Sequence, residues 1–183
     1  MNPQKIQNRT ILPILKYGDP LLRDKVKNVI NFKILPQFVD QMFNTMYEER
    51  GIGLAANQVG KMIHLLVIDT STSEEDNKPY IFINSKIKNT VGSIIMEEGC
   101  LSVPDIRASI ERPETITLEY QDLEHNVNKK CFSGLESRVI QHELDHLEGK
   151  FFVDYLSPSK RILIHKRLLD ISKNGKPSTG IIL

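Results

Sequence analysis

Apolar residues recur at two different spacings along this chain, one typical of helices and one typical of strands. Between residues 35 and 50 they recur at helical intervals, and Gly51 follows as a stop signal. The members of this stripe are Leu35, Phe38, Val39, Met42 and Met46. The spacing predicts an amphipathic helix that packs on a core, and its methionines are interpreted as core filler.

Short aliphatic and β-branched runs dominate the middle of the chain and predict strands. A polar, acidic loop at residues 71–79 separates the first two of them. The predicted strands are residues 64–69, 80–84, 94–96, 115–120 and 127–132. Helical spacing returns at residues 135–147 and again at residues 158–171.

The order of these elements indicates the fold class. Strands cluster in the middle and helices lie at the ends, without the regular alternation of a parallel sheet. This favours an α+β fold with mixed or mostly antiparallel sheets and a C-terminal helix. We expect one domain over residues 1–183, with a polar leader at residues 1–10 and a flexible tail at residues 174–183.

Composition narrows the class of protein. Hydrophobic residues make up 40% and charged residues 26%, which is ordinary for a globular protein and argues against disorder or a membrane span. The formal net charge of +1 offers no electrostatic footprint for nucleic acid or an anionic membrane, so neither is predicted as a partner. Two cysteines and no apolar leader of secretory length indicate reduced thiols and a cytoplasmic protein, with no support for organellar targeting.

The strongest chemical signal is the segment from Gln141 to His146, which contains a His-Glu-x-x-His pattern. On a helix, His142 and His146 lie one turn apart on the same face, with Cβ atoms about 5–6 Å apart, so both rings can reach one metal ion. Glu143 projects beside the ion and can act as a general base on a water that the metal activates. The alternative is a surface helix with two solvated histidines, and the apolar neighbours in the segment argue against it.

A two-histidine site needs a third ligand, and Cys100 is the candidate. It follows Gly99 in a short segment that leaves a predicted strand, where the glycine lets the backbone bend closely. A thiolate with two imidazoles leaves the fourth position of a tetrahedral ion open for water, as in a catalytic site. A buried apolar thiol is the alternative, and it is the interpretation we keep for Cys131.

A run of small residues from Gly51 to Gln58 ends in an amide side chain. Small residues allow close approach of a substrate, and Gln58 can donate an N–H to a developing oxyanion. The run lacks the Lys-Ser/Thr ending of a phosphate loop. Tight packing without function is the alternative for such a segment.

Together these segments resemble the signature motifs of the peptide deformylase family. The family motifs Gly-x-Gly-x-Ala-Ala-x-Gln, Glu-Gly-Cys-x-Ser and His-Glu-x-x-His stand here at Gly51 to Gln58, Glu98 to Ser102 and His142 to His146, without departure. The likeness extends to residues 18–23, 146–149 and 154–156, and covers most of residues 11–173.

The resemblance implies sheets around a central metal-binding helix and hydrolytic removal of the N-formyl group from the N-terminal methionine of nascent polypeptides. It implies Cys100, His142 and His146 as ligands of one divalent ion, with ferrous iron the usual physiological metal and zinc, nickel or cobalt as substitutes. It also implies Glu143 as the base, with the Gln58 side chain and the Leu101 N–H as oxyanion donors. The implied substrate-binding residues are Ile52, Gly53, Met96, Glu98, Gly99, Leu135 and Val139.

Two other functions remain open at this stage. A zinc peptidase would take a downstream third ligand, for which the chain offers Glu148, Asp154, His165 and Asp170. A non-catalytic binder of formylated N-termini would have no need of Glu143 or Gln58. Transient docking to the ribosome could use Lys160, Arg161, Lys166 and Arg167, although a solvated helix face is the simpler interpretation of these charges.

Overall fold

The computed structural model describes residues 10–71 and 79–174. The predicted leader, tail and acidic loop therefore lie almost entirely outside the described residues. The helices are α1 (Leu35–Glu48), α2 (Gly134–Leu147) and α3 (Pro158–Asn174), with short 3-10 helices at Pro20–Arg23, Ala56–Val59 and Phe152–Tyr155. The strands are β1 (Gly53–Ala55), β2 (Leu65–Ile68), β3 (Tyr80–Val91), β4 (Ile94–Cys100), β5 (Val103–Arg112), β6 (Thr115–Gln121) and β7 (Val127–Ser133).

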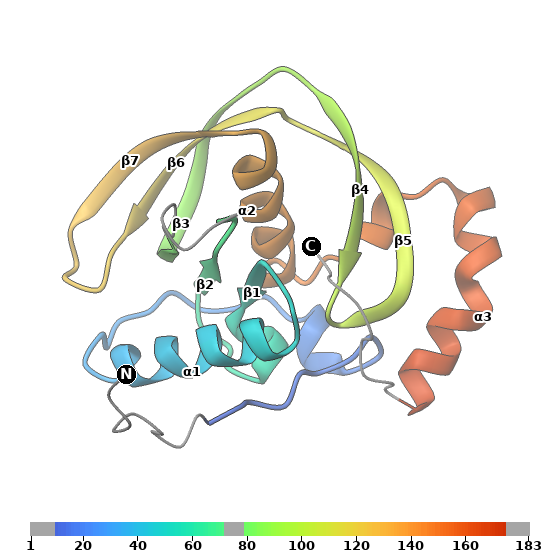
Figure 1. Ribbon diagram of the computed structural model, residues 1–183, viewed down its shortest axis with the longest axis horizontal. Helices are drawn as coiled ribbons and strands as arrows, with labels where there is room; N and C mark the ends of the chain where they lie inside the picture. The colour runs from blue at the N-terminus through green and yellow to red at the C-terminus, as the bar shows by residue number, and fades with distance from the viewer. Residues whose placement is uncertain (1–9, 72–78, 175–183) are drawn as a thin grey trace, which may run out of the picture.

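Two antiparallel sheets surround α2 (Figure 1). The larger has the order β1-β2-β3-β6-β7, and the smaller pairs β4 with β5. The chain arches over α2 twice, from β3 into β4 and from β5 into β6, so the helix lies between the sheets. The predicted α+β class, antiparallel sheets and C-terminal helix are confirmed.

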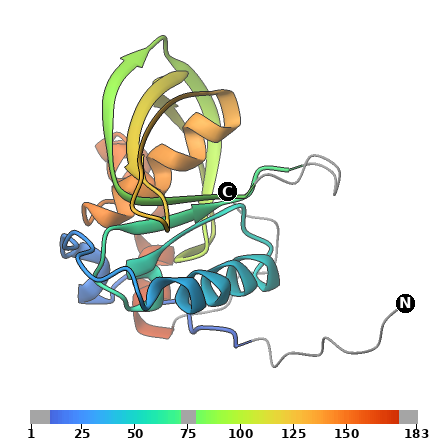
Figure 2. The same ribbon diagram turned by 90° about the vertical axis from the view of Figure 1, so that its left-hand side faces the viewer.

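Alternate residues of β2 explain how this arrangement is packed. Leu65 and Val67 join the apolar cluster under α1, whereas Leu66 and Ile68 join the cluster under α2. Successive side chains of a strand point to opposite faces, so α1 and α2 cover opposite faces of the same sheet (Figure 2). A third cluster fills the space between β4–β5 and α3.

Two strands were missed by the sequence analysis, and β3 and β4 extend well beyond the predicted residues. β1 has only three residues, too few for a periodic signal. β5 alternates buried Ile106 and Ile110 with charged exposed residues, and Pro104 obscures its start. β3 continues from residue 84 to Val91 as a largely exposed extension with irregular register, and β4 continues from residue 96 to Cys100. Cross-strand pairing, not apolar content, holds these extensions.

Within the described residues, no helix combines the length and apolar character that crossing a bilayer requires.

Candidate metal centre

Cys100, His142 and His146 converge at the centre of the molecule. The histidine rings project from one face of α2, with centroids 4.9 Å apart and planes at 80°. Cys100 ends β4, and its Sγ lies 3.1 Å from His146 Nε2. One ligand atom from each residue lies within 4.8 Å of the other two, and all three residues are buried. The structure thus brings the predicted ligands together.

The donor set fits one divalent ion. His142 Nε2 is buried and has no hydrogen-bond partner within residues 10–71 and 79–174, which leaves a lone pair free for a metal. A thiolate with two imidazoles suits zinc or iron and leaves a further coordination position for a reactant.

Glu98 fixes the orientation of His142. Its Oε2 lies 2.9 Å from His142 Nδ1, so the other ring nitrogen faces the ligand cluster. A carboxylate on the remote nitrogen of a ligating histidine sets its tautomer and raises its basicity. Glu98 is completely buried, so its side chain serves this contact and offers no surface to a substrate.

Two arginines neutralise Glu98. Arg112 donates from Nε and Nη2 to its two oxygens at 2.6 and 3.0 Å, and Arg138 donates from Nη1 at 2.8 Å. Burial alone would raise the pKa of Glu98, but the hydrogen bonds from His142 and Arg112 outweigh it and hold this pKa well below its ordinary value. The sequence analysis missed both arginines. A glutamate that is buried beside a metal ligand needs cationic partners, but sequence alone does not say which.

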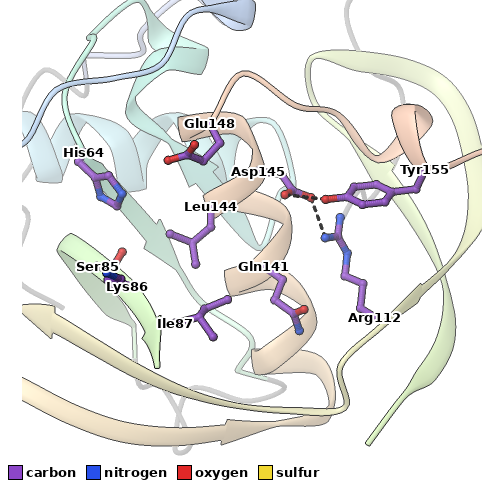
Figure 3. Close-up of a pocket in the computed structure, with 10 residues that line it drawn as sticks. All are labelled: His64, Ser85, Lys86, Ile87, Arg112, Gln141, Leu144, Asp145, Glu148 and Tyr155. Atoms are coloured by element: carbon purple, nitrogen blue, oxygen red, sulfur yellow. Dashed lines mark hydrogen bonds and ion pairs between the residues drawn. The ribbon is translucent and has the colours of Figure 1, made fainter. Parts of the chain in front are cut away.

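The network continues to the outer face of α2. Arg112 Nη1 lies 2.7 Å from Asp145 Oδ2, and the Tyr155 hydroxyl donates to Asp145 Oδ1 at 2.9 Å (Figure 3). A cavity of about 300 Å³ opens on this face. Its lining contains Gln141, Leu144 and Asp145 but none of the three candidate ligands, so it is a separate site from the metal centre.

Glu143 occupies a different environment on the inner face. It is 1% exposed, and its Oε2 has no hydrogen-bond partner among the residues that the structure describes. Burial raises the pKa of Glu143 to about 7. A carboxyl group with this pKa can both accept and return a proton near neutrality.

Gly53 permits the close approach of β1 to Glu143. A Cβ at this position would lie 2.5 Å from Glu143 Oε1 and 2.6 Å from Val139 Cγ1. Any side chain there would displace the base, which explains the glycine in physical terms.

Gln58 is held with its amide nitrogen towards the ligand cluster. Its Oε1 accepts the Ala55 N–H at 2.8 Å, which fixes the direction of the amide. Its Nε2 then lies 3.2 Å from Ser102 Oγ and 3.6 Å from Cys100 Sγ. Leu101, between these two residues, is buried at the edge of the same cluster.

The remaining substrate-binding candidates lie around this centre. Ile52 and Leu135 are partly buried and pack in one apolar cluster with Val139. Met96 is half-buried on β4 opposite Ile110, and Gly99 is buried beside Cys100. Their contact with a substrate stays a prediction.

Residues 18–23 and 154–156, the first and last segments that resemble the family, contact each other in the structure. Arg23 and Asp154 form a two-pronged ion pair at 2.5 and 3.1 Å. The Arg23 guanidinium also lies 4.5 Å from the centre of the Phe151 ring, which contacts His146 edge-on. These distant motif residues therefore support one side of the metal centre.

Comparison with known proteins agrees with this geometry. Residues 11–162 match the family model described as polypeptide deformylase. The chain is 45% identical to peptide deformylase 2 of Xanthomonas campestris over 168 residues, covering 90% of this chain and 98% of the relative. It is 43% identical to the peptide deformylase of Chlorobaculum parvum over 173 residues, covering 93% and 92%.

Solved structures give the same result. The peptide deformylase of Thermus thermophilus superposes with a TM-score of 0.84 at 34% identity, covering 89% of this chain and 98% of that one. A plant peptide deformylase superposes with a TM-score of 0.83 at 36% identity, covering 91% and 95%. The chain therefore belongs to the peptide deformylase family, the metal-dependent hydrolases that remove the formyl group from the N-termini of polypeptides.

Proposed function

We propose that Cys100, His142 and His146 bind the single catalytic ion and that Glu143 is the general base for deformylation. The observation that carries the proposal is the coincidence of a buried thiol–imidazole cluster with a buried carboxylate whose Oε2 has no hydrogen-bond partner among the described residues and whose pKa is raised to about 7. When bound, the ion supplies Lewis acidity and makes water a stronger acid. Every other step falls to side chains and backbone groups of this chain.

Glu143 accepts a proton as water attacks the formyl carbon, and later returns it to the leaving amine. The Gln58 amide and the Leu101 N–H stabilise the negative charge that develops on the formyl oxygen. The lack of a side chain at Gly53 keeps the base close to the backbone of β1, where a peptide substrate can bind. Formate and a free α-amino group are the products.

The substrate proposed is a nascent polypeptide that begins with formyl-methionine. The methionine side chain would bind among Ile52, Met96, Leu135 and Val139, with Gly53 offering backbone hydrogen bonds and Gly99 allowing close approach. The backbone of Glu98 would complete this site, since its carboxylate is engaged with His142 and the arginines. Apolar lining with few polar groups suits a thioether side chain.

The zinc peptidase alternative loses its candidate third ligands. Asp154 binds Arg23, and Glu148 binds Lys25 on the outer side of α2. None of the four candidates, which also include His165 and Asp170, belongs to the described cluster of groups that could hold a metal, which Cys100 completes. The binder alternative leaves the raised pKa of Glu143 without a use.

Ferrous iron is the physiological metal we propose, with zinc, nickel or cobalt as substitutes, and we infer a cytoplasmic location. Transient contact with the ribosome through α3 would suit co-translational deformylation. Arg161 of this helix already pairs with Asp154 at 3.3 Å, which leaves a solvated helix face as the simpler account of its charges.

The experiment that tests the proposal is formate release from formyl-Met-Ala-Ser by protein purified anaerobically, with metal quantified in the same sample. Turnover at about one ion per chain is the expected result, and the assay also identifies the ion. Full occupancy without formate would favour the binder. An empty site is reloaded with iron, and inactivity after reloading would overturn the assignment.

A further inference from the structure

The segment that precedes the first 3-10 helix is fastened between two of the motifs at the metal centre. The Leu15 N–H donates to the Gln58 carbonyl at 2.8 Å, and the Tyr17 N–H donates to the Ser102 carbonyl at 2.8 Å. Lys16 lies between these two anchors, so its backbone position is fixed relative to both motifs.

The Lys16 side chain turns towards the second motif. Its Nζ donates to the Leu101 carbonyl at 2.8 Å, across 85 positions of sequence, from a half-buried position. Burial lowers the pKa of Lys16, while the nearby charges of Glu49 and Cys100 act in the opposite direction. A partly desolvated ammonium forms a stronger hydrogen bond to a carbonyl than a solvated one.

The carbonyl that Lys16 contacts belongs to the same peptide group as the Ser102 N–H. That N–H donates to Cys100 Sγ at 3.4 Å. Hydrogen bonds in a chain polarise one another, so a cation on the carbonyl makes the N–H of the peptide a better donor. The ammonium thus acts on the sulfur through one peptide unit, without touching it.

Hydrogen bonds to a ligating sulfur reduce the electron density that it donates to the metal. We propose that Lys16 is a positioning residue that holds the Leu101–Ser102 peptide and, through the Ser102 N–H, weakens electron donation from the Cys100 thiolate. This inference rests on the proposed ligand set. The metal stays more electrophilic as a result, and Leu101, the proposed oxyanion donor, is held in place by the same contact.

The cobalt(II) form of the protein provides a direct test, because a cobalt-bound thiolate gives a sulfur-to-metal charge-transfer absorption band. Lys16→Met should move this band to longer wavelength, since a less hydrogen-bonded sulfur gives up an electron more easily. It should also lower kcat about tenfold at unchanged KM, the lower end for loss of an outer support of a metal site. Lys16→Arg, which keeps a cationic donor, should restore both properties.

Lys33→Met is the matched control, because Lys33 is exposed in the turn before α1. Lys16→Gln serves as a second variant, should the methionine protein fail to fold. An unchanged band in folded Lys16→Met, or in Lys16→Gln where that variant replaces it, would overturn the inference. A missing thiolate band in the unaltered cobalt protein would instead overturn the ligand set, so the two failures are distinguishable.

Discussion

The two sides of the metal centre place a buried carboxylate in opposite electrostatic environments. On the β1 side, Glu143 forms no ion pair within the described part of the chain, and burial raises its pKa to about 7. On the β4–β5 side, Glu98 is equally buried, but hydrogen bonds from His142 and Arg112 hold its pKa well below the ordinary value. Burial is therefore the same on both sides, and the partners decide the charge.

This difference separates two roles. Glu98 stays ionised and fixed, which suits a group that orients a metal ligand. Glu143 is poised to gain and lose a proton, which suits a base. Exchanging the environments would abolish both roles, and substitutions on each side test this claim.

The largest effect is expected at Glu143. Glu143→Gln keeps the shape and all three candidate ligands but removes the proton acceptor, so turnover should fall on the order of 10⁴-fold, the upper range for a general acid–base group. Metal content should be unchanged. Glu136→Gln on the same helix is the control, and loss of metal from Glu143→Gln would refute a purely chemical role.

Glu98→Gln should act on metal binding and stability before it acts on chemistry. Arg112 and Arg138 would each lose a buried anionic partner, and breaking such a network costs about 3–5 kcal/mol of unfolding free energy. Metal affinity should fall roughly 10–100-fold because His142 loses its orienting partner. Denaturant unfolding and competition with a chelator measure the two effects.

Glu97→Gln is the neighbouring control for that experiment. Its side chain is 61% exposed and pairs with Arg107 at 3.4 Å, so little change is expected. If Glu98→Gln binds metal as tightly as the unaltered protein, the orienting role is wrong.

Gln58→Ala should leave the metal bound and lower turnover about 10²–10³-fold, as for removal of one oxyanion donor. The Gln58 amide nitrogen already faces Cys100, so it needs little movement to meet a formyl oxygen beside the cluster. Asn126→Ala, in an exposed turn remote from the centre, controls for the loss of an amide. Near-normal turnover by Gln58→Ala would remove Gln58 from the mechanism.

The sequence predicted the position of Glu143 but not the partners of Glu98. Helical spacing was enough to place His142 and Glu143 correctly, because both lie on one continuous element. The partners of Glu98 could not be predicted, because Arg112 and Arg138 reach it from separate elements and only the tertiary fold brings them together. β5, which carries Arg112, also lacks a clear apolar run.

The same limit applies to the role of Glu98. The resemblance implied substrate contact, whereas the structure directs its carboxylate to His142. Local pattern predicts which residues share a helix face, but the charge state of a buried group depends on side chains that are distant in the sequence.

The pKa difference predicts opposite pH responses in the metal-free protein. The folded-state pKa of Glu143, about 7, lies above its ordinary value of 4.5, so its contribution to stability is present below pH 4.5 and is lost as the pH rises through 7. Glu143→Gln has no group that titrates here, so it should not lose this stability. Between pH 4.5 and 8, the free energy of unfolding of the variant should therefore rise relative to that of the unaltered protein by on the order of 2–3 kcal/mol.

Denaturant midpoints measured across this pH range give the difference directly. Glu98 has a lowered folded-state pKa, so its contribution is present above pH 4.5 and is lost only as the pH falls below it. The titration of Glu98 therefore does not change the stability between pH 4.5 and 8. A Glu143→Gln curve parallel to that of the unaltered protein would show that Glu143 is not the group with the raised pKa.

The smallest effect is expected at Asp154, which sharpens the contrast between buried and accessible charge. Asp154 pairs with Arg23 and Arg161, but its side chain is 23% exposed and theirs are 40% and 45% exposed. Water can replace these contacts, so Asp154→Asn should cost no more than about 1 kcal/mol of unfolding free energy, against several for Glu98→Gln. Glu119→Gln, in the still more accessible pair with Lys88, is the control.

Turnover of Asp154→Asn should stay unchanged, because Arg23 can remain over Phe151 without its carboxylate partner. A tenfold fall in turnover would instead mean that this accessible ion pair positions His146 through Phe151, and that partner identity outweighs burial on this side as well.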